Sequence, residues 1–347
     1  MRKHPKEYFR RTAFLTLSRS NRRIVLFAAF CTAAVASAGF CQSTDTLNIL
    51  HTSDIHIVYD LGECHPILAR KHNLVRGGMD SLERFFASTL TQMKADAVVI
   101  TGDLLDMFEG ETKSHELLAN QIAQFRALTD KSPVPLYLTL GNHDLTKYTV
   151  HDADSSVVES QTSADRARAS WIRNIPCFHD GTYYAKLVLI GKTNYHFIFL
   201  DNGYSLHDGG RVIDKTQLDW LQEQVSDAGN QPIVLFFHIY FSLGDINEDG
   251  ISFKEKGPLD WPSAKQCSEG LLKILNENRN IKAMVVGHGH SDVFEGIRFP
   301  GGHTIYQIET GSVTEGSMNW RLLQFTEDGI VVSHQGSRKA ELKIDLK

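Results

Sequence analysis

The chain has 347 residues, of which 42% are hydrophobic and 22% charged, as in an ordinary soluble protein with a substantial buried core. Lys and Arg (36) are fewer than Asp and Glu (41), giving a formal charge of −5. The first 38 residues hold eight of the basic residues and one acidic residue, so the rest carries 28 basic against 40 acidic residues, about −12. This charge disfavours long nucleic acid and anionic membranes as partners.

Residues 1–38 have the order of a secretory signal peptide. A basic region ends at Arg23, an apolar segment covers Ile24–Val35, and Ala36-Ser37-Ala38 supplies the small residues of a cleavage site. We therefore expect export to the periplasm or the medium, with an uncleaved membrane anchor or a lipidated Cys41 as alternatives. The apolar segment is short for a transmembrane helix, so stable membrane insertion is not expected.

Residues 45–347 show no linker-like break and are predicted to form a single domain. The cysteines that remain after cleavage are widely spaced and lie in no CxxC motif, which argues against a thiol nucleophile and leaves their pairing open. They are Cys41, Cys64, Cys177 and Cys267.

The first half of this domain alternates between strand and helix patterns. Apolar runs at Leu47–His51, Ala97–Ile100 and Val134–Leu140 predict buried strands. Helical spacing of apolar residues predicts helices over Met79–Lys94 and Lys113–Leu128. Right-handed crossovers would make the strands parallel neighbours. Their C-terminal ends would then share one edge, where open α/β sheets bind ligands.

The second half is predicted to be richer in strands. Residues 146–180 are polar and are expected to cross over the ligand-binding edge, with a short helix near Asp165–Ile175. Further helices are predicted from a capping box at Asp214 to Val225 and over Ala264–Asn276, the latter after a loop at 243–262. The predicted strands are Tyr183–Ile190 and Tyr195–Leu200 as a hairpin, Ile233–Phe237, Ile281–Val286, and then antiparallel Thr304–Ile308, Trp320–Phe325, Ile330–His334 and Glu341–Ile344.

Side chains that can bind metal follow, or end, five of the apolar runs. Taken singly, each has a structural explanation: Asn142 is a common turn residue after glycine, and His238 alone is more typical of a buried core histidine. The repetition at strand ends favours a shared site. The candidates are Asp54, His56, Asp103, Asn142, His143, His238, His288 and His290.

The spacing of these residues predicts how they act together. Asp54-x-His56 and His288-x-His290 would place both side chains on one side of an extended segment, with glycines 287 and 289 allowing a tight turn. Asp103 has two carboxylate oxygens and can bridge two ions. Nitrogen and oxygen ligands without sulfur suit Mn, Fe or Zn. Two such ions would polarise a phosphoryl group and activate a water as hydroxide.

The motif series resembles that of the calcineurin-like metallophosphoesterase superfamily, D-x-H, G-D-x-x-D, G-N-H-D/E, H and G-H-x-H. The matching stretches are Asp54-Ile55-His56, Gly102-Asp103-Leu104-Leu105-Asp106, Gly141-Asn142-His143-Asp144, His238 and Gly287-His288-Gly289-His290. The resemblance implies an α/β fold. Two mixed β-sheets would form a sandwich flanked by helices, with the metal site at the C-terminal strand edge.

The resemblance also assigns roles. It implies that Asp103 is shared by two metal ions. His143 would be the general acid or charge stabiliser at the leaving group, with Asp144 holding its ring, although Asp144 could instead cap a turn. Asp106 is expected to stabilise its loop. The remaining ligands would be Asp54, His56 and His290 for one ion, and Asn142, His238 and His288 for the other.

The chain departs from two branches of the superfamily. Met107 and Asp144 stand where protein Ser/Thr phosphatases carry Arg and Glu, and Ile239 follows His238 where many cyclic-nucleotide phosphodiesterases carry a second His. The sequence thus predicts a metal-dependent hydrolase of a small phosphomonoester or phosphodiester. A nuclease of the same superfamily and a non-catalytic metal- or ligand-binding protein are the alternatives.

Substrate specificity is expected to reside in loops near the metal edge, within 59–76, 146–180 and 241–262. For each candidate contact residue, an ordinary exposed polar or aromatic side chain is the more common explanation. These candidates are His65, His72, Tyr148, His151, His207 and Tyr240.

Overall fold

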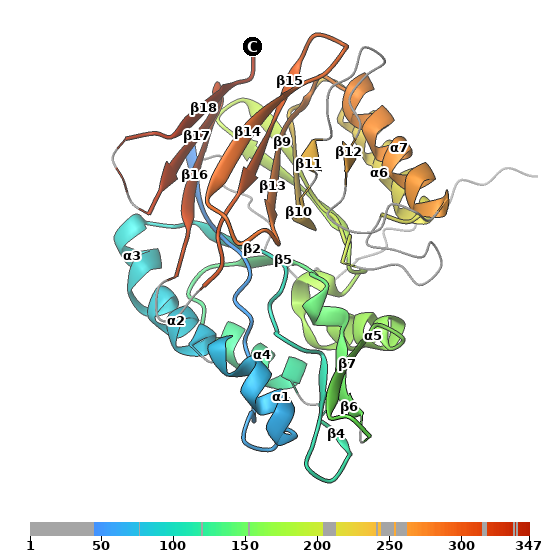
Figure 1. Cartoon of the computed structure of the whole chain (residues 1–347). Helices are drawn as coiled ribbons and strands as arrows, with labels where there is room; N and C mark the ends of the chain where they lie inside the picture. The colour runs from blue at the N-terminus through green and yellow to red at the C-terminus, as the bar shows by residue number, and fades with distance from the viewer. Residues whose placement is uncertain are drawn as a thin grey trace, which may run out of the picture. The chain divides into compact units, whose positions relative to one another are not determined.

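Two six-stranded mixed β-sheets are the largest sheets in the computed structural model (Figure 1). The structure describes residues 45–347, apart from 76, 119–120, 152, 204–212, 241, 244–252, 255–261, 314–317, 336 and 338. The first sheet has the strand order β18-β17-β16-β1-β2-β5, and the second has the order β14-β15-β13-β10-β9-β8. The predicted α/β architecture of two mixed sheets flanked by helices is confirmed.

In the first sheet, the early strands pair as predicted. β1 is parallel to β2, and β2 is parallel to β5. The end of the chain returns to this sheet and adds antiparallel strands beside β1. The bounds are β1 Thr46–Thr52, β2 Ala97–Thr101, β5 Leu136–Thr139, β16 Arg321–Thr326, β17 Gly329–His334 and β18 Leu342–Asp345.

The second sheet has a parallel centre and antiparallel edges. β9, β10, β13 and β15 are parallel, while β8 and β14 run antiparallel at the two edges. The sequence predicted β15 as part of an antiparallel series, but β15 pairs in parallel with β13, so this prediction is wrong for that pair. The strand β14 was not predicted. The bounds are β8 Tyr184–Ile190, β9 Thr193–Phe199, β10 Ile233–Ile239, β13 Ile281–Gly287, β14 Val293–Arg298 and β15 Thr304–Glu309.

The two sheets bury a common core because side chains alternate along each strand. Phe197 and Phe236 of the second sheet share this core with Phe325 of the first, and the ring centroids of Phe197 and Phe325 lie 4.9 Å apart. The intervening residues Ile198 and Leu235 face the opposite way, into a second core with α6 and α7. Strands buried on both faces read as continuous apolar runs, which is why these were recognisable in the sequence.

Helices cover both sheets, and Figure 1 shows α6 and α7 side by side along the second. Asp214 caps α6 by accepting a hydrogen bond from the Gln217 amide at 2.8 Å, as predicted, whereas the Gln217 side chain bonds to the backbone of Asp201. The helices are α1 Pro66–Lys71, η1 His72–Val75, α2 Gly78–Arg84, the π-helix η2 Phe85–Thr89, α3 Leu90–Met93, α4 Gln121–Thr129, η3 His143–Leu145, α5 Ala164–Asn174, η4 Pro176–Phe178, α6 Lys215–Ala228 and α7 Pro262–Glu277.

Two segments differ from the predicted elements. The predicted helix over Lys113–Leu128 begins only at Gln121, because the Thr112 hydroxyl accepts hydrogen bonds from the amides of Ser114 and Glu116 and closes a turn. Residues 147–160, predicted as polar crossover, form the hairpin β6–β7. The small sheets contain β3 Glu109–Glu111, β4 Leu117–Leu118, β6 Lys147–His151 and β7 Ser156–Ser160, and separately β11 Ser242–Leu243 and β12 Phe253–Lys254.

Some predictions fall outside the described residues, namely residues 1–38, Cys41, His207 and most of the 243–262 loop. Export and signal cleavage therefore stay predictions. The described residues lie within one compact unit, Phe40–Lys347, and the predicted domain limits also stay predictions. Cys64 and Cys177 are free thiols. Among the described helices, none has the length and apolar character that crossing a membrane requires.

A buried histidine connects the two sheets. The ring of His51, on β1, lies between the hydroxyl of Thr101 at the end of β2 (2.8 Å) and that of Thr310 just after β15 (2.7 Å). Burial, together with the nearby guanidinium of Arg321, lowers the pKa of His51 from 6.5 to about 3. The ring is therefore neutral in the folded protein at neutral pH.

This pKa predicts acid lability. Because the folded-state pKa lies below the unfolded value, His51 contributes stability that is present above about pH 6.5 and is lost as the pH falls toward 3. We expect His51→Gln to reduce the proton uptake on unfolding by up to about one proton between pH 6.5 and 4.5. Urea titrations of metal-free protein across this range measure it. An unchanged pH dependence would contradict the assignment.

Candidate metal centre

The predicted ligands come from strand ends in both sheets and meet between them. The Nε2 atom of His238, near the end of β10, lies 3.1 Å from Oδ2 of Asp103, which follows β2. The Nε2 atom of His290, which follows β13, lies 3.3 Å from Oδ1 of Asp54, which follows β1. The site is therefore built by the contact of the two sheets rather than by either sheet alone.

The loops that carry the ligands have an unusual backbone. The strand β1 ends at Thr52, so the expected extended geometry of Asp54-x-His56 is wrong, and the same holds for His288-x-His290 after β13. Left-handed conformations cost non-glycine residues about 1–3 kcal/mol each and persist where the surroundings enforce them. The residues with positive φ are Asp54 (52°), His56 (50°), Asp103 (46°), His288 (72°) and His290 (56°).

The glycines of the last motif make room rather than supply the turn. A Cβ atom on Gly287 would lie 1.8 Å from Oγ of Ser53, and one on Gly289 would lie 2.2 Å from Oε1 of Glu309. The left-handed turns fall on the neighbouring histidines instead, which corrects the expectation that these glycines provide the tight turn. The loop can approach Asp54 at Gly287, and Glu309 at Gly289, only because it lacks side chains at these two points.

Three groups of side chains could hold a metal ion; two of them consist only of predicted metal ligands, and the third is His56, Asp106 and His143. The first group is Asp54, His56 and His290, and the second is Asp103, His238 and His288. Within the first, the Nε2 atoms of His56 and His290 lie 3.2 Å apart. Asp103 also reaches the first group, with Oδ2 3.8 Å from Nε2 of His56. The carboxylate of Asp103 therefore lies near candidate ligands of both groups.

Several buried oxygen and nitrogen atoms of the predicted ligands have no hydrogen-bond partner among the described residues. They include Oδ1 of Asp54, Oδ1 of Asn142 and Nε2 of His238. Nδ1 of His238 donates to the carbonyl of Thr101 at 2.7 Å, which leaves Nε2 facing the carboxylate of Asp103 at 3.1 Å. A proton on Nε2 satisfies both atoms in the metal-free protein, and a metal ion can take the place of that proton. The residues therefore fit a metal pair with nitrogen and oxygen ligands.

The electrostatics agree with this fit. Burial opposes charge on Asp103, yet the adjacent His238 and His143 hold its pKa well below the usual range. Burial likewise lowers the pKa of His238, but Asp103 and Asp54 raise it to about 9 overall. Clustered carboxylates thus attract a positive charge into the site. Whether each candidate binds metal stays a prediction, whereas their spatial convergence is a property of the fold.

His143 lies at the accessible side of the centre. Its side chain is 25% exposed, and its ring meets that of His56 edge-on at 4.8 Å. Its amide donates to Oδ1 of Asp103 at 2.9 Å, and its Nδ1 donates to the carbonyl of Asp106 at 2.8 Å. The Nδ1 bond fixes the ring and leaves Nε2 as the nitrogen available to a substrate.

The structure corrects the predicted role of Asp144. Its carboxylate accepts hydrogen bonds from the amides of Gly141 (2.8 Å), Leu104 (3.2 Å) and Leu105 (2.8 Å) rather than from the ring of His143. Burial and the nearby Asp103 raise the pKa of Asp144 to about 7. The residue therefore joins two ligand loops, which is the turn-capping alternative that the sequence left open.

Asp106 has the role that was predicted for Asp144, which is to hold the ring of His143. Its Oδ1 lies 3.0 Å from Nδ1 of His56 and 3.4 Å from Nδ1 of His143, and its Oδ2 accepts from Nδ1 of His72. A carboxylate behind a ligand histidine fixes the ring and directs Nε2 to the metal. Sequence reasoning assigned Asp106 only to its own loop, although its place in the G-D-x-x-D motif was a usable signal.

Some of the other residues predicted to contact the substrate are buried, and some are exposed. His72 is buried with its ring edge-on to buried Tyr148 (4.7 Å), so both lie behind the site rather than on its surface. His65 caps α1, and His151 is exposed beside Asp154. Tyr240 is half-buried with its ring 6.2 Å from His288 and remains a candidate for substrate contact.

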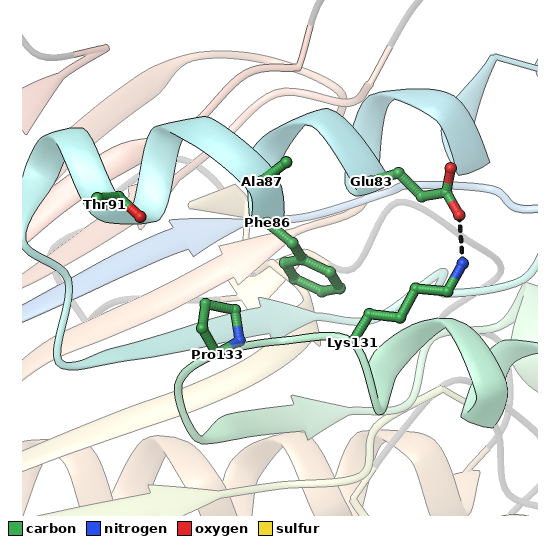
Figure 2. A pocket seen from close by; sticks show the side chains of 6 residues that line it. All are labelled: Glu83, Phe86, Ala87, Thr91, Lys131 and Pro133. Atoms are coloured by element: carbon green, nitrogen blue, oxygen red, sulfur yellow. Dashed lines mark hydrogen bonds and ion pairs between the residues drawn. The ribbon is translucent and has the colours of Figure 1, made fainter.

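A surface hollow lined mostly by helical residues does not overlap the candidate metal centre. It has a volume of about 510 Å³ and lies between the α2–η2–α3 segment and the connection from α4 to β5 (Figure 2). An ion pair of 2.6 Å between Lys131 and Glu83 spans it. Its lining contains no ligand candidate, so we assign it no part in the chemistry.

Comparison with known proteins identifies the family. The calcineurin-like phosphoesterase family matches residues 47–292, well over half of the chain. The chain belongs to this family. Its members are metallophosphoesterases, so the protein is a hydrolase with a metal-binding site and small-molecule substrates. No curated protein sequence matches the chain.

Solved structures share the fold at low sequence identity. A dimetal phosphatase from Danio rerio is 17% identical with a TM-score of 0.52, covering 87% of this chain and 99% of its own. A purple acid phosphatase from yellow lupin (Lupinus luteus) seeds is 12% identical with a TM-score of 0.48, covering 86% of this chain and 53% of its own. At these identities the first likeness shows the fold alone.

The position of Asp106 predicts an effect on metal affinity. Asp106→Asn keeps the size of the side chain but removes the charge that orients His56, so we expect metal binding to weaken about 10- to 100-fold. Competition with a chromophoric chelator measures this. The surface change Asp130→Asn, at an exposed ion pair with Arg126, is the control. Wild-type affinity in the Asp106 variant would contradict the role.

Proposed function

We propose that the protein hydrolyses a small phosphomonoester or phosphodiester with a pair of transition-metal ions. The observation that supports this most is the carboxylate of Asp103 between two ligand groups, with the ring of His143 beside it. When bound, the two ions would polarise the phosphoryl group and make water nucleophilic at neutral pH. Mn, Fe and Zn suit the donor set.

The protein's own residues would bind the metals and hold their ligand rings in position. Asp54, His56 and His290 would bind one ion, and Asn142, His238 and His288 the other, with Asp103 shared. The contacts of Asp106 to His56 and of Thr101 to His238 set which ring nitrogen faces inward. These two rings are thereby fixed before the substrate arrives, which limits reorganisation during the reaction.

His143 would donate the proton to the leaving oxygen. Burial lowers its pKa, but Asp103 and Asp106 raise it above the ordinary value overall, which favours the protonated ring. Because Nδ1 is bonded to the carbonyl of Asp106, the proton would leave from Nε2. A protonated ring also stabilises negative charge on the phosphate as the ester bond breaks.

The strongly acidic body favours a small substrate over a long nucleic acid, as the sequence charge predicts. Rates on matched aryl phosphate monoesters and diesters, measured on the metal-loaded protein, would distinguish the two ester classes. This comparison narrows the substrate most, because both classes fit the same metal pair.

The role of His143 predicts a leaving-group effect. We expect His143→Ala to lower kcat about 10²- to 10⁴-fold on alkyl phosphates and less on p-nitrophenyl phosphate, whose leaving group needs little protonation. Metal content should not change. His151→Ala, at an exposed histidine of β6, is the matched control. A metal-loaded His143 variant with wild-type turnover of alkyl phosphates would refute the acid role.

A further inference from the structure

One loop serves both metal groups, and it is strained. His288 belongs to the group of Asp103, and His290 belongs to the group of Asp54. Both residues have left-handed backbones, with φ of 72° and 56°. Such conformations persist only where neighbouring contacts enforce them. The contacts that hold this loop therefore decide whether both sites are formed.

The far side of the loop is held by Asp292, two residues after His290. Oδ1 of Asp292 accepts hydrogen bonds from the amide of Gly311 at 3.0 Å and from Nη1 of Arg321 at 3.1 Å. Its Oδ2 lies 3.6 Å from Nε2 of His334. These partners come from the connection after β15 and from β16 and β17, so Asp292 ties the loop to both sheets.

Arg321 is the buried residue that holds the carboxylate of Asp292 in place. It is 1% exposed, and Nη1 also donates to the carbonyl of Glu309 at the end of β15. Its Nε donates to Oε2 of Glu341 at 3.0 Å. A buried guanidinium needs such partners and is held rigidly by them. Arg321 and Glu341 lie beyond residue 292, where the family match ends.

We propose that Asp292 is a positioning residue that, held by Arg321, keeps the His288–His290 loop in the conformation that binds both metals. The inference rests on the proposed metal centre. It adds that the last part of the chain, outside the matched family region, sets metal affinity. Asp292 itself does not touch the metals in this account and acts through the loop backbone.

A general loss of stability has to be separated from this role, and the chain offers a matched pair. Asp292 and Glu341 contact the same guanidinium at 3.1 and 3.0 Å, and their side chains are 26% and 28% exposed. Glu341 precedes β18 at the edge of the first sheet, away in sequence from the ligand loops. Removing either takes one carboxylate away from Arg321, and Tm reports the stability that each change costs, but only Asp292 should affect metal binding.

The test compares Mn²⁺ binding by equilibrium dialysis in wild type, Asp292→Ala, Asp292→Asn and Glu341→Ala, with Tm of each metal-free protein. We expect the Asp292→Ala Kd to rise about tenfold or more and the Glu341→Ala Kd to stay within about twofold of wild type. Asp292→Asn keeps an acceptor oxygen, so it should fall between wild type and Asp292→Ala, and it serves as the test if the Ala variant does not fold.

The outcomes are distinct. Wild-type affinity in both Asp292 variants would overturn the positioning role, as would an equal loss of affinity in Glu341→Ala at an equal fall in Tm. Wild-type protein that binds no Mn²⁺ would overturn the metal centre as well as this inference. A loss of affinity in the Asp292 variants that exceeds what their fall in Tm accounts for, relative to Glu341→Ala, supports the role.

Discussion

The buried carboxylate of Asp103 is the point on which the site depends. It is 1% exposed, it receives the amide of His143, and it lies 3.1 Å from the ring of His238, which belongs to the other sheet. A charge buried this deeply is stable only with positive partners on several sides. Histidines can provide some of that charge, and metal ions would provide more. The contact between the two sheets, which brings His238 beside Asp103, therefore also stabilises the ionised form of this carboxylate.

Backbone strain is the cost of bringing ligands from two sheets to one point. Asp54 and Asp103 turn left-handed directly after their strands, and the amide of Asp54 donates to the carbonyl of Gly102 at 3.1 Å across the two loops. Gly141 lies so close to Asp103 that a Cβ atom would be 2.2 Å from its carboxylate. Strain held by such packing keeps ligand geometry fixed before a metal or substrate binds.

Much of this was predictable, and the limits have physical causes. The buried strands and the ligand candidates were visible because strands covered on both faces give continuous apolar runs that end in polar residues. The left-handed loops were not, since they depend on contacts between distant segments. The same reason explains the exchange of roles between Asp144 and Asp106, because which carboxylate reaches a histidine is decided by the fold of the loops. The hairpin β6–β7 was missed because its alternation is short and half of it is exposed.

Anomalous scattering at the manganese edge, measured on crystals of the protein soaked with Mn²⁺, would locate the bound ions. We expect two anomalous peaks, one on each side of the Asp103 carboxylate, with one among Asp54, His56 and His290 and the other among Asn142, His238 and His288. A single peak away from Asp103, or no peak at these residues in fully soaked crystals, would contradict this expectation.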